Sequence, residues 1–511
     1  MKKFVKATLI ITVFSVATRA LGFVLRIVLS RLMGAETLGA YQISMSIFGV
    51  LMTIIASGLP LIVSRNVSYY QDKDVKKQNR IISAGTTIGL SISLLIVVLF
   101  FACKDFILLA VNEESVNMIL ILLPCLIVSS IYAILRGGLW GKKKFFTISF
   151  TEFFEQVVRI IILIVLVLLP IDLSMGNKSA LSLTLSAVAS CLLVFILYFC
   201  YGEKFANPKG EIKPILKSSA PITLVRTISS VIGSIIAIIL PSRLMLFGYS
   251  RAEALAVFGV YMGMTLPLIM VPSTFISSIA IALVPELSKE TNNIALASEK
   301  TKLILQNKIM MAIKSVFAIS FVLMPAFISV GIPICKVLFN NAQAGQYLVM
   351  SAALMKPMGI NQICSSILNA IGLEKRELLN YSVGAILLVI CVVVLPQYVG
   401  GISILIGLGV MHIMSAILSL VELKRRNLIN WSFNKYFAIC GLILAPTALL
   451  GHLIYSLLAR VINLFVSTII SGGLTFIFTI LLMYVFNVAN LKIVVYKHRQ
   501  NKNKLHEKTT V

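Results

Sequence analysis

The chain has 511 residues, of which 59% are hydrophobic and only 13% are charged. A single core in water cannot bury that much apolar surface, so the composition excludes a soluble globular protein and indicates that lipid surrounds much of the chain. The formal charge of +26 raises the question of a nucleic-acid partner, but the basic residues stand in short clusters between apolar runs, which is typical of membrane-protein loops and argues against nucleic acid.

Apolar segments long enough to cross a bilayer follow one another along the whole chain. Backbone groups in lipid must be satisfied within their own segment, so these segments are predicted to be α-helices. The predicted fold class is an all-α integral membrane protein with about fourteen transmembrane helices. The predicted spans are residues 7–30, 41–64, 81–103, 116–135, 147–170, 179–201, 218–240, 254–284, 309–334, 346–371, 379–399, 401–421, 437–459 and 464–487.

The placement of lysine and arginine predicts the orientation of these spans. Most of the 45 lysines and arginines fall in every second connection along the chain, together with the two ends. Short loops rich in lysine and arginine stay in the cytoplasm. We therefore predict a multi-pass protein with both termini in the cytoplasm.

A short motif occurs twice and predicts two related lobes. Ser30–Met33 (SRLM) recurs as Ser242–Met245, and Gly39–Tyr41 (GAY) is followed six spans later by Gly259–Tyr261 (GVY). Copies six spans apart have the same orientation, so an axis along the membrane normal would relate the lobes; chance similarity at a common turn is the alternative. We predict two six-helix lobes around a central cavity and two extra helices, divided as an N-lobe (1–208, spans 1–6), a C-lobe (209–428, spans 7–12), spans 13 and 14 (429–487) and a basic cytoplasmic tail (488–511).

Basic side chains outnumber acidic ones inside the predicted spans. Only Glu152 and Glu155 are acidic there, whereas six residues are basic: Arg19, Arg26, Arg159, Arg226, Lys314 and Lys356. Each charge costs at least ~2.5–3.5 kcal/mol at a helix centre and therefore needs a partner or water. This surplus of cations predicts a water-filled, positively charged cavity that takes an anion.

Four of these cations are the candidate substrate-binding residues. Arg19 and Arg26 are two helical turns apart and so share one face of span 1. Arg226 lies in span 7, the equivalent helix of the second lobe, and Lys356 lies mid-span beside Pro357. Arginine suits phosphate because its planar fork makes bidentate charge-assisted bonds. Snorkelling toward the outer headgroups is the alternative for Arg26.

Arg159 has a structural explanation instead. Glu155 precedes it by four residues, which is the favourable order for an ion pair along a helix. We therefore predict a structural ion pair between Glu155 and Arg159 within span 5.

Motifs for catalysis or for metal binding do not stand out in this sequence. We find no Ser/His/Asp set, HExxH, Walker-type loop or GxGxxG, and the eight cysteines include no C-x-x-C pair. The outside loops are short and poor in carboxylates, so they offer few side chains that could act in catalysis. We predict no enzymatic activity, no cofactor and no metal site.

Several of these residues resemble a known family. Thr18–Phe23 (TRALGF), then Arg26 and Ser30–Ala35 (SRLMGA), resemble the first helix of the polysaccharide and lipid flippases of the multidrug/oligosaccharidyl-lipid/polysaccharide exporter superfamily. Gly58–Pro60 followed by Arg65 is similar to the end of their second helix. Glu155–Arg159 (EQVVR) resembles the stage V sporulation protein B branch especially, and the span count fits the peptidoglycan-precursor (lipid II) flippases.

This resemblance implies a flippase in the bacterial cell membrane that works by alternating access. Its cargo would be a polyprenyl-diphosphate-linked sugar, such as lipid II or a related unit for the cell wall or spore cortex, moved from the inner to the outer leaflet. Membrane lipids and cell-wall synthesis proteins would be its other partners. In relatives, arginines of the first helix contact the diphosphate, and the matching residues here are Arg19 and Arg26.

Two alternatives stay open beside this interpretation. The lipid II branch has a further arginine in the middle of its second helix, where this chain has Ser44, Met45 and Ser46. A teichoic-acid or exopolysaccharide unit is the first alternative cargo, because these units share the polyprenyl diphosphate. A multidrug exporter of the same superfamily is the second alternative, although exporters of cationic drugs would be expected to hold acidic residues in the cavity.

Overall fold

The computed structural model describes residues 2–71, 73–291, 299–429 and 434–486, and within these ranges the regular structure is helical. The chain divides into two compact units, Met1–Gly263 and Met264–Val511. The basic tail predicted at 488–511 lies outside the described residues. We describe each unit by itself.

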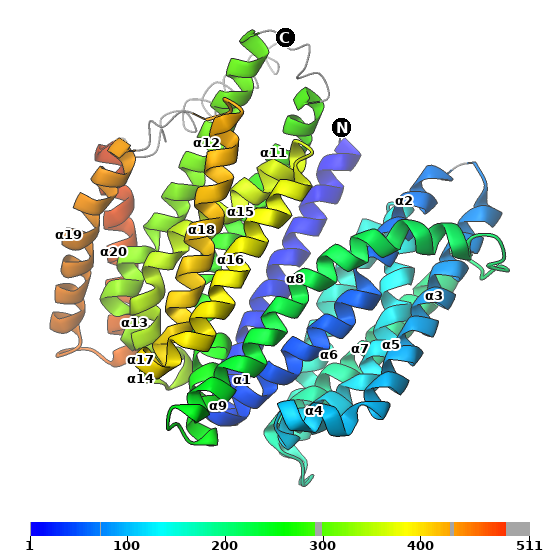
Figure 1. The fold of residues 1–511 in the computed structure, drawn as a ribbon, viewed down its shortest axis with the longest axis horizontal. Helices are drawn as coiled ribbons and strands as arrows, with labels where there is room; N and C mark the ends of the chain where they lie inside the picture. The colour runs from blue at the N-terminus through cyan, green and yellow to red at the C-terminus, as the bar shows by residue number, and fades with distance from the viewer. Residues whose placement is uncertain (1, 72, 292–298, 430–433, 487–511) are drawn as a thin grey trace. The chain divides into compact units, whose positions relative to one another are not determined.

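Unit 1 consists of long helices that run side by side (Figure 1). A hydrophobic cluster at its centre joins α2, α3, α5 and α7 through residues such as Ile62, Ile82, Ile134 and Val194, each no more than 5% exposed. The helices are α1 (Lys2–Ala56), α2 (Gly58–Tyr69), α3 (Val75–Ala102), α4 (Lys104–Ala110), α5 (Glu113–Gly141), α6 (Phe145–Leu168), α7 (Met175–Cys200), α8 (Ile212–Leu246) and α9 (Arg251–Gly259), followed by the first residues of a π-helix, η1 (Val260–Thr265).

The first predicted span and most of the second lie in α1, and the second span ends in α2. The helix breaks at Gly34, whose φ of 72° and ψ of 178° are backbone angles that only glycine adopts readily. Gly34 follows directly on the first copy of the SRLM motif. The chain therefore turns between spans 1 and 2 without a separate loop.

The two copies of the repeat meet where α1 crosses α9. A Cβ atom on Gly39 would lie 2.0 Å from the carbonyl oxygen of Leu255, and one on Gly259 would lie 2.3 Å from that of Ala35 and 2.5 Å from the amide nitrogen of Gly39. The backbones are thus in direct contact, as small residues allow between membrane helices. Residues that match between two copies are expected to meet where a twofold axis passes, so this contact fits the predicted repeat.

Unit 2 contains two packed groups of helices. In one group α15 packs on α11, α12 and α18, and α16 packs on α18; in the other, α13 packs on α14, α19 and α20. The helices are α10 (Leu266–Ile269), α11 (Val271–Thr291), α12 (Glu299–Val322), α13 (Met324–Phe339), α14 (Ala342–Ser351), η3 (Ala352–Leu354), α15 (Met355–Ala370), α16 (Glu374–Val394), α17 (Pro396–Val399), η4 (Gly400–Ile402), α18 (Ser403–Arg425), α19 (Asn434–Leu458) and α20 (Leu464–Val485).

The all-α membrane class is confirmed, whereas the count of fourteen spans stays a prediction. Among the described residues, eleven helices are long and apolar enough to cross a membrane. Predicted spans 1 and 2 fall in one of them, Ile11–Tyr69. Predicted span 5 corresponds to α6, which carries Glu152, Glu155 and Arg159, and predicted span 10 is divided among α14, η3 and α15. These three differences account for the lower number.

The boundary between the two units differs from the predicted lobe boundary at 208/209. Helices α8 and α9 belong to unit 1 because α8 packs on α1, α2 and α3 and α9 packs on α1. The assignment of spans 7–12 to a second lobe is therefore still a prediction.

Candidate functional site

Three of the four predicted substrate-binding residues belong to unit 1. Arg19 and Arg26 lie on the part of α1 before Gly34, which is continuous helix, so they are two turns apart as expected. Arg226 lies on α8, and all three residues have exposed side chains. Lys356 is on α15 in unit 2.

Arg26 belongs to a cluster that also contains Tyr41 and Arg159. The Nη2 atom of Arg159 on α6 donates a hydrogen bond to the Tyr41 hydroxyl on α1 at 2.9 Å. Arg26 lies close enough to both residues to interact with them electrostatically. Tyr41 is the third residue of the Gly39–Tyr41 repeat, so the sequence contained a signal for it that the search for charged residues missed.

The acidic residues of α6 lie beside this cluster. Arg136 on α5 forms an ion pair with Glu152, which ties α5 to α6. Glu155 interacts electrostatically with Arg159 and Arg136. The predicted Glu155–Arg159 pair is not among the ion pairs between described residues, so it stays a prediction, and the contact that the structure shows for Arg159 is the one to Tyr41.

We expect Tyr41→Phe to lower the stability of the protein. The change removes only the hydroxyl that accepts the bond from Arg159, and a lost hydrogen bond to a charged group costs about 1.5–3 kcal/mol. Heat-induced loss of the monodisperse peak of the detergent-purified protein measures the effect. Tyr398→Phe is the control because Tyr398 is 74% exposed; equal thermal midpoints for the two variants would contradict the role of Tyr41.

Arg226 contacts the break between α1 and α2. Its Nη1 atom donates to the carbonyl oxygen of Ser57 at 3.3 Å, and Ser57 is the residue between the two helices. Pro60 interrupts the hydrogen-bond ladder there, and carbonyl groups at a helix C-terminus carry partial negative charge. Arg226 therefore has one structural contact, and its remaining donors are free of any hydrogen bond to the described residues.

Two aromatic rings of α12 lie beside Lys356. Its Nζ atom lies 4.7 Å from the ring centroid of Phe321 and 5.3 Å from that of Phe317, both on α12. Ring faces attract an ammonium group, which lowers the cost of placing it at membrane depth. These contacts explain how an ammonium group is accommodated at this position of α15.

The family described as polysaccharide biosynthesis protein matches residues 4–291. Stage V sporulation protein B of Bacillus subtilis (strain 168) is 24% identical over 402 residues, a match that covers 75% of this chain and 76% of that protein.

Two solved structures share the fold. The lipid II flippase MurJ in an inward closed conformation matches with a TM-score of 0.70 at 16% identity, covering 94% of this chain and 100% of that one. A multidrug resistance MATE family transporter of the MOP superfamily, in an inward-facing conformation, matches with a TM-score of 0.65 at 17% identity, covering 80% of this chain and 94% of that one. The resemblance inferred from the sequence motifs is thereby confirmed at the level of family and fold.

Proposed function

We propose that this chain, which belongs to the polysaccharide biosynthesis protein family, moves a polyprenyl-diphosphate-linked oligosaccharide from the inner to the outer leaflet of a bacterial cell membrane. The observation that carries the proposal is the set of cations in membrane helices. Arg19, Arg26 and Arg226 lie in helices of spanning length, and few carboxylates lie at the same depth to neutralise them.

A diphosphate is the ligand that this set of groups suits best. Guanidinium groups bind phosphate oxygens through paired, charge-assisted bonds, and they keep their charge at any physiological pH. Arg26 is held near Tyr41 and Arg159, and Arg226 is held at Ser57, so each of the two has a defined place in unit 1. Lys356 is a further cation, on α15 of unit 2.

The transport cycle in this proposal is alternating access between two lobes. Both termini lie in the cytoplasm, the cargo enters from the inner leaflet, and its diphosphate is held by the cations while the lobes change their arrangement. Stage V sporulation protein B and the lipid II flippase support a unit of the cell wall or spore cortex as cargo. Teichoic-acid and exopolysaccharide units carry the same diphosphate.

A multidrug exporter is the second candidate function, because a MATE family transporter shares the fold. A cationic drug would bind carboxylates, and the acidic residues of α6 are engaged with arginines: Glu152 pairs with Arg136, and Glu155 lies near Arg159. The charges in unit 1 therefore favour an anionic cargo.

Complementation tests the proposed function. The gene is expressed in a bacterium whose own lipid II flippase can be switched off, and growth is followed after the switch, with membrane abundance measured in parallel. We expect rescue by the wild type. A well-expressed wild type that fails to rescue would contradict lipid II as cargo, and the same test in strains that lack the flippase for another polyprenyl-linked unit would then decide between the remaining cargoes and drug export.

A further inference from the structure

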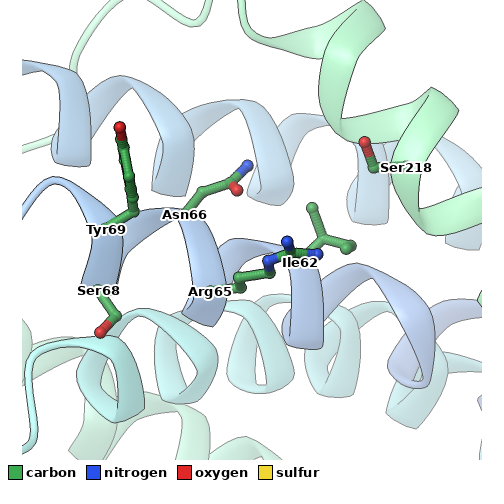
Figure 2. Close-up of a pocket in the computed structure, with 6 residues that line it drawn as sticks. All are labelled: Ile62, Arg65, Asn66, Ser68, Tyr69 and Ser218. Carbon is green, nitrogen blue, oxygen red and sulfur yellow. The ribbon is translucent and has the colours of Figure 1, made fainter. Parts of the chain in front are cut away.

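A cavity of about 540 Å³ lies between α2 and α8, and Arg19, Arg26 and Arg226 are not among its lining residues. Figure 2 shows Asn66 and Tyr69 extending from α2 on the side where Ser218 of α8 lies. Both helices belong to unit 1. The residues that line the cavity are Ile62, Arg65, Asn66, Ser68, Tyr69 and Ser218.

Close packing between the two helices fixes one end of this cavity. A Cβ atom on Gly58 would lie 2.5 Å from Oγ1 of Thr223 and 2.6 Å from the carbonyl oxygen of Ser219, so α2 and α8 touch at Gly58. One turn further, Ile62 and Ile215 are buried in the same hydrophobic cluster. The walls of the cavity are therefore formed by packed helices and not by a loop.

The polar residues of α2 continue the same side of the helix past this apolar contact. Arg65, Asn66 and Tyr69 follow Ile62 by three, four and seven residues, which places them along one face. Val63 and Val67, about 100° round the helix from Ile62 and Asn66, are fully buried in the core. The helix thus holds its apolar face in the core and presents a guanidinium, an amide and a phenol to the cavity.

The cavity is positively charged. The side chain of Arg65 is exposed and takes part in none of the hydrogen bonds or ion pairs found between described residues. A second cation lies beside the lining residue Tyr69, where the Nζ atom of Lys73 is 4.3 Å from the centroid of its ring. In the predicted topology this end of α2 lies at the inner leaflet, where lipid phosphates are within reach.

We propose that this cavity is the docking site for the diphosphate headgroup of the cargo lipid at the inner leaflet, before the cargo reaches the cations within the membrane. The inference rests on the proposed function. Arg65 binds the phosphate oxygens through its fork, and Lys73 adds charge beside Tyr69. Asn66 and Ser218 supply donors and acceptors for the sugar attached to the diphosphate.

Direct binding tests the docking site. The full chain with Arg19→Ala, Arg26→Ala, Arg226→Ala and Lys356→Ala is placed in nanodiscs of phosphatidylcholine and titrated with farnesyl diphosphate. All four candidate cations outside the cavity are thereby removed, so that the binding measured is that of the cavity. Adding Arg65→Gln should weaken this binding about ten- to hundredfold, as loss of charge-assisted hydrogen bonds predicts. Arg65→Lys should have an intermediate effect, because it keeps the charge but not the fork.

Arg80→Gln is the matched control. Arg80 is exposed, lies on α3, which packs on α2, and does not line the cavity. The change removes the same charge from the same side of the protein, so Arg80→Gln should leave the affinity for farnesyl diphosphate unchanged. If both variants lost affinity equally, binding would depend only on the general positive potential, and this result would overturn the proposal. Binding that is unaffected by Arg65→Gln, or absent before that change is made, would also overturn it.

A competition experiment distinguishes the cargo from ordinary lipid. Phosphatidylglycerol added to the nanodiscs should displace little farnesyl diphosphate; equal competition would show that the cavity binds bulk lipid phosphate and would overturn the assignment to the cargo. If wild type fails in complementation while the Arg65-dependent binding persists, the proposed function falls and the diphosphate site stands. The two proposals therefore fail separately.

Discussion

Gly259→Ala should leave little folded protein in the membrane. The added Cβ atom would lie 2.3 Å from the carbonyl oxygen of Ala35 and 2.5 Å from the amide nitrogen of Gly39, and both are backbone atoms of α1. A flexible side chain could rotate away, but backbone can yield only if α1 and α9 move apart. Overpacking typically costs about 1–3 kcal/mol, and we expect a cost at or above that range because the whole helix crossing must shift.

Gly233→Ala provides the control for this experiment. A Cβ atom on Gly233 would meet nothing within 4 Å, and alanine is the better helix former by about 1 kcal/mol. Fluorescence-detected size exclusion of both variants gives the amount of monodisperse protein and its thermal midpoint. We expect Gly233→Ala to equal or exceed the wild type. A Gly259→Ala protein with the wild-type midpoint would show that the helices do not approach this closely.

The Gly39→Ala, Gly259→Ala double variant extends the test to the repeat. Both glycines belong to one crossing, so the destabilisation should be less than additive once the first change has separated the helices. Gly39→Ala alone should be as damaging as Gly259→Ala, because its Cβ atom would lie 2.0 Å from the carbonyl oxygen of Leu255. Additive effects would mean that the two sites are independent.

The membrane class and most helices could be predicted from the sequence because hydropathy depends on local composition. Predicted spans 3 and 6, at 81–103 and 179–201, start inside α3 (Val75–Ala102) and α7 (Met175–Cys200) and end one residue past them. The break at Gly34 is a property of one residue's backbone, and a hydropathy profile does not register it. Helix α6 (Phe145–Leu168) was still recognisable as predicted span 5, at 147–170, because its other residues are strongly apolar although it carries three charges.

Contacts between distant elements could not be predicted in the same way. Tyr41 and Arg159 are 118 residues apart in the sequence, and Ser57 and Arg226 are 169 apart. Neither pair leaves a periodic pattern, because each depends on how whole helices pack. The ion pair expected for Arg159 followed from a local rule for helices, whereas the observed hydrogen bond to Tyr41 depends on tertiary structure.

The candidate cations show what a pattern of charges can indicate. Their presence at membrane depth was read directly from the sequence, because an intramembrane charge stands out in any apolar run. The partners of two of them, Ser57 for Arg226 and the rings of Phe317 and Phe321 for Lys356, required the structure. These partners lower the cost of placing Arg226 and Lys356 in apolar helices. The role of the cations in transport is tested by substitution.

Arg226→Gln should abolish transport while leaving the protein abundant. Glutamine can still donate a hydrogen bond to the carbonyl oxygen of Ser57, so the contact between α8 and the α1–α2 break can persist. The positive charge is lost, and with it the charge-assisted bonds to a diphosphate, worth about 1.5–3 kcal/mol or roughly ten- to hundredfold in binding. Removing a charge at membrane depth also lowers the cost of insertion, by about 2.5–3.5 kcal/mol at a helix centre. Arg19→Ala should behave in the same way.

Complementation with matched variants separates this role from a structural one. Arg460→Gln is the charge control, because Arg460 is exposed in the connection between α19 and α20, and it should rescue like the wild type. Arg226→Lys should rescue in part, since an ammonium keeps the charge without the fork. If Arg226→Gln and Arg19→Ala both support wild-type growth at wild-type abundance, these arginines do not bind the cargo. Loss of abundance in Arg226→Gln would instead assign Arg226 to the stability of the α1–α2 break.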